Sequence, residues 1–275
     1  MSRIEKHNPL KSSALSRQES IMRDGKCGKI QFKELTLEQV KKSAVEFGLV
    51  TDVVYQLNAG KEASIYLAMW NEHPIILKAY RLWSSPHKLS TQHGYITTGG
   101  KRTYLVTAMM EEIAVKEFDI LTWCFKGGVH VPTPIGRVGH FLTMRFIGDG
   151  LDPAPQLKDV ELENPELALD QILDDYLLMY SKVHYTHGDL SAYNILWWQE
   201  RPWIIDIPQG DQVNKWANMK KVELVLKRDI RNVLNYFEQY GIYKDEEYIL
   251  NVFLDEYIPY NLRHYRELDR GGELL

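Results

Sequence analysis

The feature that most limits how this chain can fold is a change in the spacing of its apolar residues. Three runs rich in β-branched and aromatic residues occur at 53–57, 63–69 and 74–80, separated by turn residues. Such runs predict the strands of a twisted antiparallel sheet. From Asn164 onward the apolar residues mostly recur at helical spacing. A strand-rich half followed by a helix-rich half favours an α+β fold of two lobes with a cleft between them.

Short-range signals define further elements. Thr36 and Gln39 have the spacing of a capping box and Gly48 is a stop signal, which predicts a short helix between them. Asn164 and Pro165 form a good helix start. The other expected helices lie at 107–125, 164–184, 220–240 and 244–257, and the other expected strands lie at 135–138, 141–145, 195–198 and 203–206.

This pattern divides the chain into three parts. Residues 1–29 are polar and lack periodicity, which predicts a tail. Residues 30–147 form a helical extension, the N-terminal lobe and a hinge, and 148–275 form the C-terminal lobe. A stretch near 83–103 has no usable period and carries a glycine pair, which is typical of a functional or disordered loop.

Composition limits the class of protein. The 275 residues are 44% hydrophobic and 25% charged with a net charge of −4, which excludes a generally disordered chain and a global basic field. Cys27 and Cys124 have no C-x-x-C spacing, as expected of incidental thiols in a reduced compartment. The first residues lack the apolar core of a secretory signal, and no run approaches the roughly 20 apolar residues that span a bilayer. We therefore expect a cytoplasmic protein without a membrane partner.

The strongest chemical signal is the run HGDLSAYN at 187–194, followed by IID at 204–206. Transfer of a γ-phosphoryl group needs a carboxylate beside the accepting hydroxyl and oxygen ligands for Mg²⁺. Asp189 suits the first task, and Asn194 follows at the spacing found in the kinase catalytic loop. Asp206 ends an apolar strand and could bind the metal. Each motif alone also fits an ordinary turn or cap, but their order and spacing favour a phosphotransferase.

Lys78 and Glu117 are candidates for a second part of the same site. Lys78 lies in the alternating run IILKAY, a pattern that fits the solvent face of a strand equally well. Glu117 lies near the middle of the helix at 107–125, so the two residues can form the Lys–Glu pair that holds nucleotide phosphates. Glu111 and Glu112 compete for this pairing, but acids in a first helical turn commonly just complement the helix dipole.

The turn between the first two predicted strands could cover nucleotide phosphates. Backbone N–H groups in such a turn can face anions. Its single glycine distinguishes it from a G-x-G-x-x-G loop, and most such turns are simply hairpins. Its residues are Gly60, Lys61, Glu62, Ala63 and Ser64.

Together these motifs resemble the RIO family of atypical serine/threonine protein kinases. The similar segments are AGKEASIY, ILKAY, VKEFDIL, MRFIGDG, APQL, HGDLSAYNIL and IIDIPQG, in the family's order over about 36–240. The resemblance implies a two-lobed protein-kinase-like fold that binds ATP with Mg²⁺ or Mn²⁺. Asp189 would be the catalytic aspartate, Asn194 a metal ligand, and Asp206 both a metal ligand and a transient phosphate acceptor. The nucleotide would contact the phosphate loop at 60–64, Lys78, Glu117 and the hinge residues Met144, Phe146 and Ile147.

The resemblance also implies a function. Family members are expected to phosphorylate themselves on serine, hydrolyse ATP and act in maturing the small ribosomal subunit, which makes its precursor an expected partner. They lack an activation loop and an A-P-E segment, and here Asp206 is followed by IPQG rather than by the end of D-F-G. The N-terminal part is too short for a winged-helix domain, so the chain is similar to the branch with only a helical extension. Three residues depart from the family pattern, Asn58 and Ala59 at the phosphate loop and Arg145 at the hinge.

Two other classes of function stay open on the sequence alone. A nucleotide-switched factor that binds pre-ribosomal particles fits the missing substrate-binding segment. A small-molecule kinase of the aminoglycoside or choline type shares H-G-D and a downstream Asn, but not AGKEASIY or IDIPQ. The basic residues at 215–228 could face RNA, although such runs are more often a solvated helix face.

Overall fold

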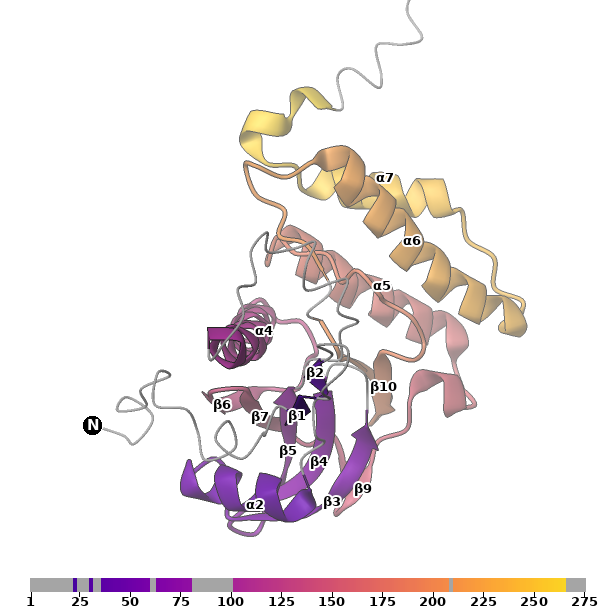
Figure 1. Cartoon of the computed structure of the whole chain (residues 1–275). Coiled ribbons are helices and arrows are strands. Elements are labelled where there is room, and N and C mark those ends of the chain that lie inside the picture. The colour runs from indigo at the N-terminus through magenta and orange to yellow at the C-terminus, as the bar shows by residue number, and fades with distance from the viewer. Residues whose placement is uncertain are drawn as a thin grey trace, which may run out of the picture. The chain divides into compact units, whose positions relative to one another are not determined.

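The computed structural model describes residues 22–23, 30–31, 36–59, 63–80, 101–207 and 210–265, and only the backbone of 22–23, 30–31 and 101–109. The chain forms two compact units (Figure 1). One contains the residues up to 119 together with 133–146, and the other contains 120–132 together with the residues from 147 onward. Strands dominate the first unit and helices the second, which confirms the predicted α+β fold class.

The first unit is built on a five-stranded antiparallel sheet with the strand order β3-β4-β5-β7-β6. The strands expected from alternation are present: β5 pairs with β7, so Lys78 lies opposite Leu142 on a central strand. Central placement is what buries the strand that carries this lysine. The strand bounds are β3 Asp52–Ala59, β4 Ala63–Trp70, β5 His73–Tyr80, β6 Pro134–Val138 and β7 Phe141–Arg145.

Local signals define both ends of α2 (Leu37–Glu46). The predicted capping box of Thr36 and Gln39 is present, with each side chain bonding the other residue's backbone N–H. At the other end Gly48 has a φ of +68°, and the N–H groups of Gly48 and Leu49 bond carbonyls of the last turn at 2.9 and 3.0 Å. This arrangement requires a left-handed residue, which is why a glycine ends the helix.

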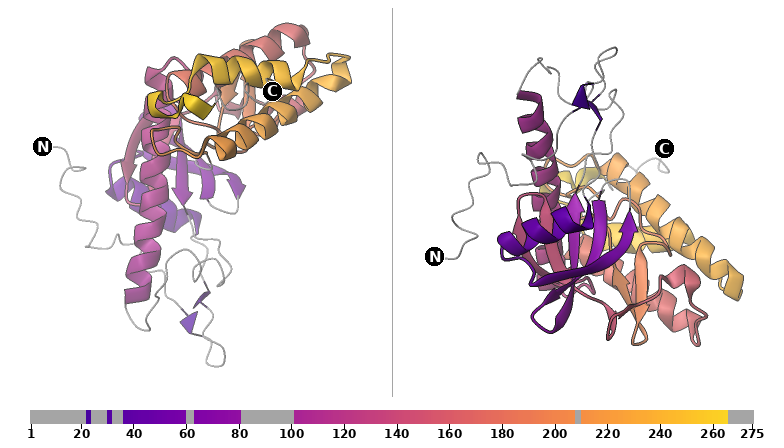
Figure 2. Two further views of the ribbon diagram at one scale, coloured as in Figure 1. Left: turned by 90° about the horizontal axis from the view of Figure 1, so that it is seen from above. Right: turned by 60° about the horizontal axis from the view of Figure 1, so that its bottom comes forward.

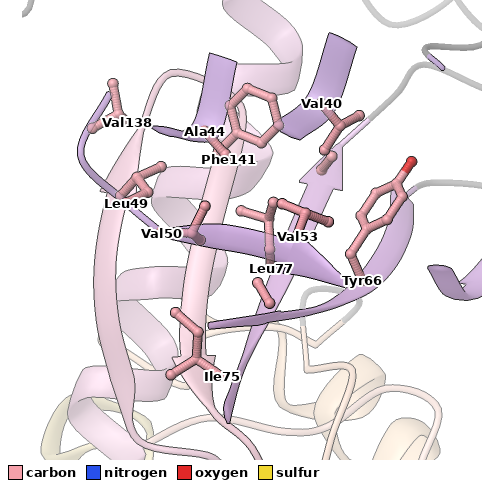
Figure 3. Close-up of a cluster of buried hydrophobic side chains, with 12 residues drawn as sticks. Val40, Ala44, Leu49, Val50, Val53, Tyr66, Ile75, Leu77, Val138 and Phe141 are labelled. Carbon is pink, nitrogen blue, oxygen red and sulfur yellow. The ribbon is translucent and has the colours of Figure 1, made fainter. Parts of the chain in front are cut away.

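A cluster of buried apolar side chains joins α2 to the sheet (Figure 3). Val40 and Ala44 of α2 face strand residues such as Tyr66 and Leu77. Burial of each large apolar side chain contributes roughly 1.5–3 kcal/mol, so this cluster stabilises the packing of α2 on the sheet. The labelled members are Val40, Ala44, Leu49, Val50, Val53, Tyr66, Ile75, Leu77, Val138 and Phe141.

Helix α4 (Lys101–Lys126) begins earlier than the sequence predicted. The expected helix started at 107 and the expected loop reached 103, but 101–103 are helical. The physical reason is that Lys101 and Arg102 are good helix formers, and the break in the sequence is the glycine pair before them. Residues 81–100 lie outside the described part of the chain, so the loop stays a prediction there.

The second unit contains three long helices that pack side by side (Figure 2). Its first helix starts at the predicted Asn164 cap, where Asn164 Oδ1 accepts a hydrogen bond from the backbone N–H of Leu167 at 3.2 Å. It ends before the predicted position 184, because the chain turns and His184 has a φ of +57°. Gly241, with a φ of +75°, is the predicted break between the last two helices. The helices are α5 Pro165–Ser181, α6 Met219–Phe237 and α7 Glu246–Glu256.

A hairpin of β10 (Ile195–Trp198) and β11 (Arg201–Ile204) precedes the long loop of this unit. The sequence predicted the second strand at 203–206, two residues too late. Gln199 and Glu200 both have positive φ values, as a tight two-residue hairpin turn requires, so pairing resumes directly after them. The remaining short elements are β1 Met22–Arg23, β2 Ile30–Gln31, β8 Gly148–Asp149, β9 Asp152–Pro153, η1 Leu157–Asp159, η2 Glu238–Tyr240 and η3 Tyr260–Leu262.

Membrane and thiol chemistry receive no support from the described residues. None of their helices is both long and apolar enough to cross a bilayer. Cys124 is buried, and burial raises the pKa of its thiol to about 12, so it stays protonated near neutral pH. Cys27 lies outside the described ranges.

Candidate active site

The first part of the site is an ion pair in the sheet unit. Lys78 Nζ on β5 donates to both carboxylate oxygens of Glu117 on α4, each at 2.9 Å. The two residues are only 7% and 2% exposed. The expected strand–helix pair is therefore present. The competing Glu111 lies elsewhere, with Oε1 3.5 Å from where a Cβ on Gly139 would be, and burial raises the pKa of its carboxyl group.

Burial makes this ion pair sensitive to change. Two charges removed from water lose hydration, and only close, well-aligned contacts compensate for that loss. The two-pronged contact of Lys78 with Glu117 provides such geometry. The pair therefore fixes one ammonium group at a defined point on the sheet, where it can act as a point charge for an anion.

The remaining nucleotide candidates of this unit are only partly described. Gly60, Lys61 and Glu62 lie outside the described residues, whereas Ala63 and Ser64 open β4 and are buried. Their contact with phosphate stays a prediction.

The three hinge candidates are buried but belong to different units. Met144 on β7 and Phe146 belong to the sheet unit, and Ile147 begins the second stretch of the helical unit. Arg145, which departs from the family pattern, is exposed, and its backbone N–H donates to Thr133 O at 2.8 Å. An apolar run of this kind can pack against a flat aromatic base.

In the helical unit Asp189 and Asn194 form one hydrogen-bonded turn. Asn194 Nδ2 donates to the backbone oxygen of Asp189 at 2.8 Å and to its Oδ2 at 3.1 Å. Both partners can only accept, so the amide nitrogen must face Asp189 and Oδ1 is left for another partner. Asp189 is exposed and Asn194 is half-buried. The turn therefore presents one carboxylate and one amide oxygen to solvent or ligand.

The backbone holds Asp206 next to this turn. The N–H of Ile205 donates to Asn194 O at 2.9 Å. Asp206 itself has a φ of +60°, an uncommon conformation for a residue other than glycine. Such positions cost about 1–3 kcal/mol and cluster at functional sites. Because Asp206 lies two residues beyond β11, this turn and not the strand pleat sets the direction of its side chain.

His187 links the two segments and has a defined protonation state. Its Nδ1 accepts the backbone N–H of Asp189 at 3.2 Å, and its Nε2 lies 3.0 Å from Ile205 O. An N–H group can only donate and a carbonyl can only accept, so the proton must be on Nε2 and the ring is neutral. Complete burial lowers the pKa of His187, which favours the same neutral form. The sequence motif contains this histidine but gave no reason for it.

Asp229 holds the turn that contains Asp189 in place through hydrogen bonds, and it was not predicted from the sequence. Its Oδ2 accepts the N–H of Gly188 at 2.7 Å and the hydroxyl of Tyr176 at 2.8 Å. Its neighbour Arg228 donates to Gly188 O. The available signal was an aspartate at a core position of amphipathic α6, where the other buried residues are all apolar.

A second buried carboxylate organises the start of this unit. Asp175 on α5 contacts His130 Nδ1 through both oxygens at 2.9 Å, and burial raises the pKa of the Asp175 carboxyl group. His130 O accepts the N–H of Ile204, the last residue of β11, at 2.8 Å. These residues are far apart in sequence, so no local pattern could predict the contact.

The segment after Asp206 returns directly to the catalytic turn. Thr186 N–H donates to Asp211 O at 3.0 Å, and the Tyr185 hydroxyl donates to Gly210 O at 2.7 Å. A Cβ on Gly210 would lie 1.7 Å from Thr186 O, so only glycine fits this close approach. Only residues 207–209 separate Asp206 from this return, and 208–209 lie outside the described residues, so the absence of an activation loop stays a prediction.

The residues present fit a hard divalent cation. Asn194 Oδ1 and the carboxylate of Asp206 are oxygen ligands on neighbouring segments, and Mg²⁺ takes one or two such ligands and keeps waters and phosphate oxygens for the rest. No group of three or more His, Cys, Asp or Glu side chains suited to a metal occurs in the described parts of the chain. A metal at this point would therefore depend on phosphate oxygens as well as on the protein.

Solved structures show to which class of fold the chain belongs. The Rio2 kinase of Chaetomium thermophilum has a TM-score of 0.65 and 18% identity, and the match covers 92% of this chain and 78% of that one. The same kinase in an ADP/Mg²⁺-phosphoaspartate complex has a TM-score of 0.60 and 20% identity over 92% of this chain and 77% of that one. These likenesses confirm the protein-kinase-like fold.

Sequence comparison names the family within that class. The RIO domain model matches residues 64–249, so the chain belongs to the RIO family, whose curated members here are serine/threonine kinases. Serine/threonine-protein kinase RIO3 of Mus musculus is 37% identical over 47% of this chain and 24% of its own length. RIO-type serine/threonine-protein kinase Rio1 of Haloferax volcanii is 29% identical over 67% of this chain and 63% of its own length. The matched region thus spans less than two thirds of either relative.

Proposed function

We propose that the protein is a Mg-ATP-dependent serine/threonine kinase that phosphorylates itself and also hydrolyses ATP. The observation that carries this proposal is the turn in which Asn194 bonds both the backbone and the carboxylate of Asp189, with Asp206 next to it through Ile205. Family membership supports serine or threonine as the acceptor and argues against the small-molecule kinase.

Each residue has a role that its surroundings suit. The exposed carboxylate of Asp189 would accept the proton of the attacking hydroxyl, while Asn194 Nδ2 keeps it in place. Lys78 would hold the α- and β-phosphates, and 60–64, Met144, Phe146 and Ile147 would contact the phosphates and adenine. Mg²⁺ or Mn²⁺, held by Asn194 and Asp206, would neutralise charge on the phosphates.

Asp206 is also the proposed acceptor of a transient phosphate. The related Chaetomium kinase was solved as an ADP/Mg²⁺-phosphoaspartate complex. In the corresponding step here, an Asp206 oxygen would form a bond to the γ-phosphorus as the bond to the β–γ bridging oxygen breaks and ADP leaves. Water would then hydrolyse the acyl phosphate and restore the carboxylate, so the cycle hydrolyses one ATP without a protein substrate.

In the cell we propose a role in maturing the small ribosomal subunit in the cytoplasm, with its precursor particle as partner. One observation favours a nucleotide-switched assembly factor as the second candidate: the short return at Gly210 leaves no activation loop to dock a peptide. ATP hydrolysis would then time release from the particle. If Lys78→Ala and Asp206→Ala do not change how much of the protein co-sediments with the precursor particles, this switch is contradicted.

The deciding experiment measures where the γ-phosphate goes. Purified protein is incubated with Mg²⁺ and γ-labelled ATP, and label is measured on Ser or Thr, as acid-labile acyl phosphate, and as free phosphate. We expect label on serine that Asp189→Asn abolishes, and acyl phosphate that Asp206→Asn abolishes. Asp174→Asn, which removes an exposed carboxylate on α5 of the same unit, should change neither. Unchanged serine labelling by Asp189→Asn would overturn the assigned role.

A further inference from the structure

Exposed apolar side chains come from the N-terminal half of α6 and from the turn before it, and another comes from η3 (Tyr260–Leu262). Trp216 is 82% exposed, Leu224 is 69% exposed and Tyr260 is 83% exposed. Single exposed apolar residues are normal, but grouped ones mark interaction sites. Figure 1 shows the yellow segment that follows α7 beside the start of α6.

Hydrogen bonds hold these residues in one fixed group. Asn261 Nδ2 donates to Lys215 O at 2.8 Å, which ties the turn of Tyr260 to the turn of Trp216. The N–H of Trp216 donates to Asn214 Oδ1 at 2.9 Å. The hydroxyl of Tyr265 bonds Glu223 on α6. The backbone segments that carry the exposed rings are therefore held in place by hydrogen bonds.

The same surface carries cations that are not neutralised. Lys215 Nζ lies 5.1 Å from the centre of the Trp216 ring, and the Arg263 guanidinium lies 5.1 Å from that of Tyr260. Lys220 is exposed on the first turn of α6. Among the described residues none of these three cations has a carboxylate partner. We call Lys215, Trp216, Lys220, Leu224, Tyr260 and Arg263 the α6 patch.

The other basic residues of α6 differ from Lys220 because they have acidic partners. Further along the helix, Arg231 pairs with Glu246 at 2.7 Å, and Lys227 pairs with Glu247. Both acids belong to α7. Lys221 pairs with Asp211 at 2.7 Å. Basic residues elsewhere on α6 are thus matched by acids, and the patch keeps its positive charge for an outside partner.

The patch leads to the catalytic turn. Lys220, Leu224 and Arg228 follow one another at four-residue intervals and so share one face of α6. Arg228 donates to Gly188 O, directly before Asp189. The rise of a helix puts Lys220 about 12 Å along the axis from Arg228, a length that about four extended residues span. A chain lying on this face would bring a side chain near the proposed base.

We propose that the α6 patch docks an acidic protein segment with an apolar anchor residue, and that this segment presents the serine to be phosphorylated. Charge complementarity selects an acidic partner. Trp, Tyr and Arg are the residues that most often anchor protein interfaces, and the exposed aliphatic Leu224 suits a protein anchor better than a stacked base. The proposal rests on the proposed kinase function and names its substrate class. In this proposal α6 provides the substrate-docking surface that an activation loop provides in other kinases.

The test uses two fluorescent peptides with one serine and, about four residues away, either Glu-Leu-Glu or Lys-Leu-Lys. Fluorescence anisotropy with the full chain measures binding without ATP, and labelled ATP measures transfer. We expect tighter binding of the acidic peptide, weakened about tenfold by Trp216→Ala with Leu224→Ala. Lys220→Glu should reverse the preference toward the basic peptide. ATP hydrolysis without peptide should not change in either variant.

A matched control separates docking from general damage. Tyr243→Ala removes an aromatic ring that is 76% exposed but lies outside the patch, and should leave peptide binding unchanged. Equal binding of both peptides by the unmodified protein, or equal binding by the patch variants, would overturn the proposal. So would a single-stranded RNA oligonucleotide that binds through Trp216 while the peptides do not. Absence of any transfer from ATP despite peptide binding would instead count against the kinase function and leave docking supported.

Discussion

At the scale of single residues, buried polar side chains hold the candidate catalytic turn in place. Asp229 accepts hydrogen bonds from Gly188 and Tyr176, and neutral His187 accepts one from the backbone N–H of Asp189 and donates one to the carbonyl of Ile205. Buried groups of this kind are valuable only when every bond is made, because an unpaired polar atom in the interior is destabilising. The turn should therefore respond sharply to changes that touch no ligand.

The first prediction separates a lost bond from a lost acceptor. Tyr176→Phe removes one donor to Asp229 and should lower the free energy of unfolding by about 1 kcal/mol. Asp229→Ala removes the shared acceptor of the Gly188 N–H and the Tyr176 hydroxyl, and should lower it by more, at about 1–3 kcal/mol for each donor that loses its acceptor. Urea unfolding followed by circular dichroism measures both. Equal losses of unfolding free energy in the two variants would show that Asp229 is not the shared acceptor on which these hydrogen bonds depend.

The second prediction concerns pH. Burial lowers the pKa of His140 from 6.5 to about 4 and also lowers that of His187. Below about pH 6.5 the unfolded chain binds protons that the folded chain does not, so stability should fall as the pH drops from 6.5 toward 4. Each histidine contributes at most about 1.4 kcal/mol per pH unit to this slope. Urea unfolding across this window measures it.

His140→Leu is the variant that tests this origin. Among the described residues His140 Nε2 has no hydrogen-bond partner, so its removal breaks none of the bonds described for that atom. In this variant the free energy of unfolding should fall less steeply as the pH drops, because unfolding takes up as many as one proton fewer. An unchanged slope would assign the pH dependence to other groups.

At the scale of elements, the sequence predicted those whose limits depend on local chemistry. The capping box and Gly48 defined α2, and Asn164 with Pro165 defined the start of α5, because caps act over a few residues. The predicted start of α4 and the predicted bounds of β11 were wrong. Apolar periodicity did not show that the helix extends back to Lys101, or that strand pairing resumes directly after the two-residue hairpin turn. Asp229 and the contact of His130 with Asp175 could not be read locally, because their partners come from distant segments.

The third prediction tests whether the α2 cap matters as much as its geometry indicates. Thr36→Ala removes the side-chain acceptor of the capping box and should lower the free energy of unfolding by about 1 kcal/mol. Gly48→Ala places a Cβ at a φ of +68° and should lower it by about 1–2 kcal/mol. Lys42→Ala, an exposed change within the same helix, is the control and should have little effect. Guanidinium unfolding of the three variants ranks them.

At the scale of the whole molecule, the chain divides its candidate machinery between two units. The buried pair of Lys78 and Glu117 belongs to the sheet unit, and the turn of Asp189, Asn194 and Asp206 belongs to the helical unit. Motif order along the sequence was enough to predict both sets and the family. The bonds that fix them were not predictable, since each depends on a fold that brings distant segments together.

The last prediction uses the ion pair to separate stability from function. Lys78→Met leaves Glu117 buried without its lysine, and Glu117→Leu leaves the reverse, so each should lower the free energy of unfolding by about 3–5 kcal/mol. The double variant buries two apolar side chains in their place and should recover most of that loss, because a buried pair is often replaceable by apolar residues. Thermal unfolding with and without Mg-ATP then measures nucleotide binding.

A ligand that binds only the folded state stabilises it by about 2.7 kcal/mol at one hundred times its dissociation constant. The unmodified protein should show that shift with Mg-ATP, and the double variant should not, although it is folded. A double variant that keeps the full shift would mean that Lys78 does not hold the nucleotide, whatever its contribution to the fold. One that stays as unstable as the single variants would mean that the pair is required for packing, and the nucleotide shift of Lys78→Arg, which keeps the charge, would then decide its role.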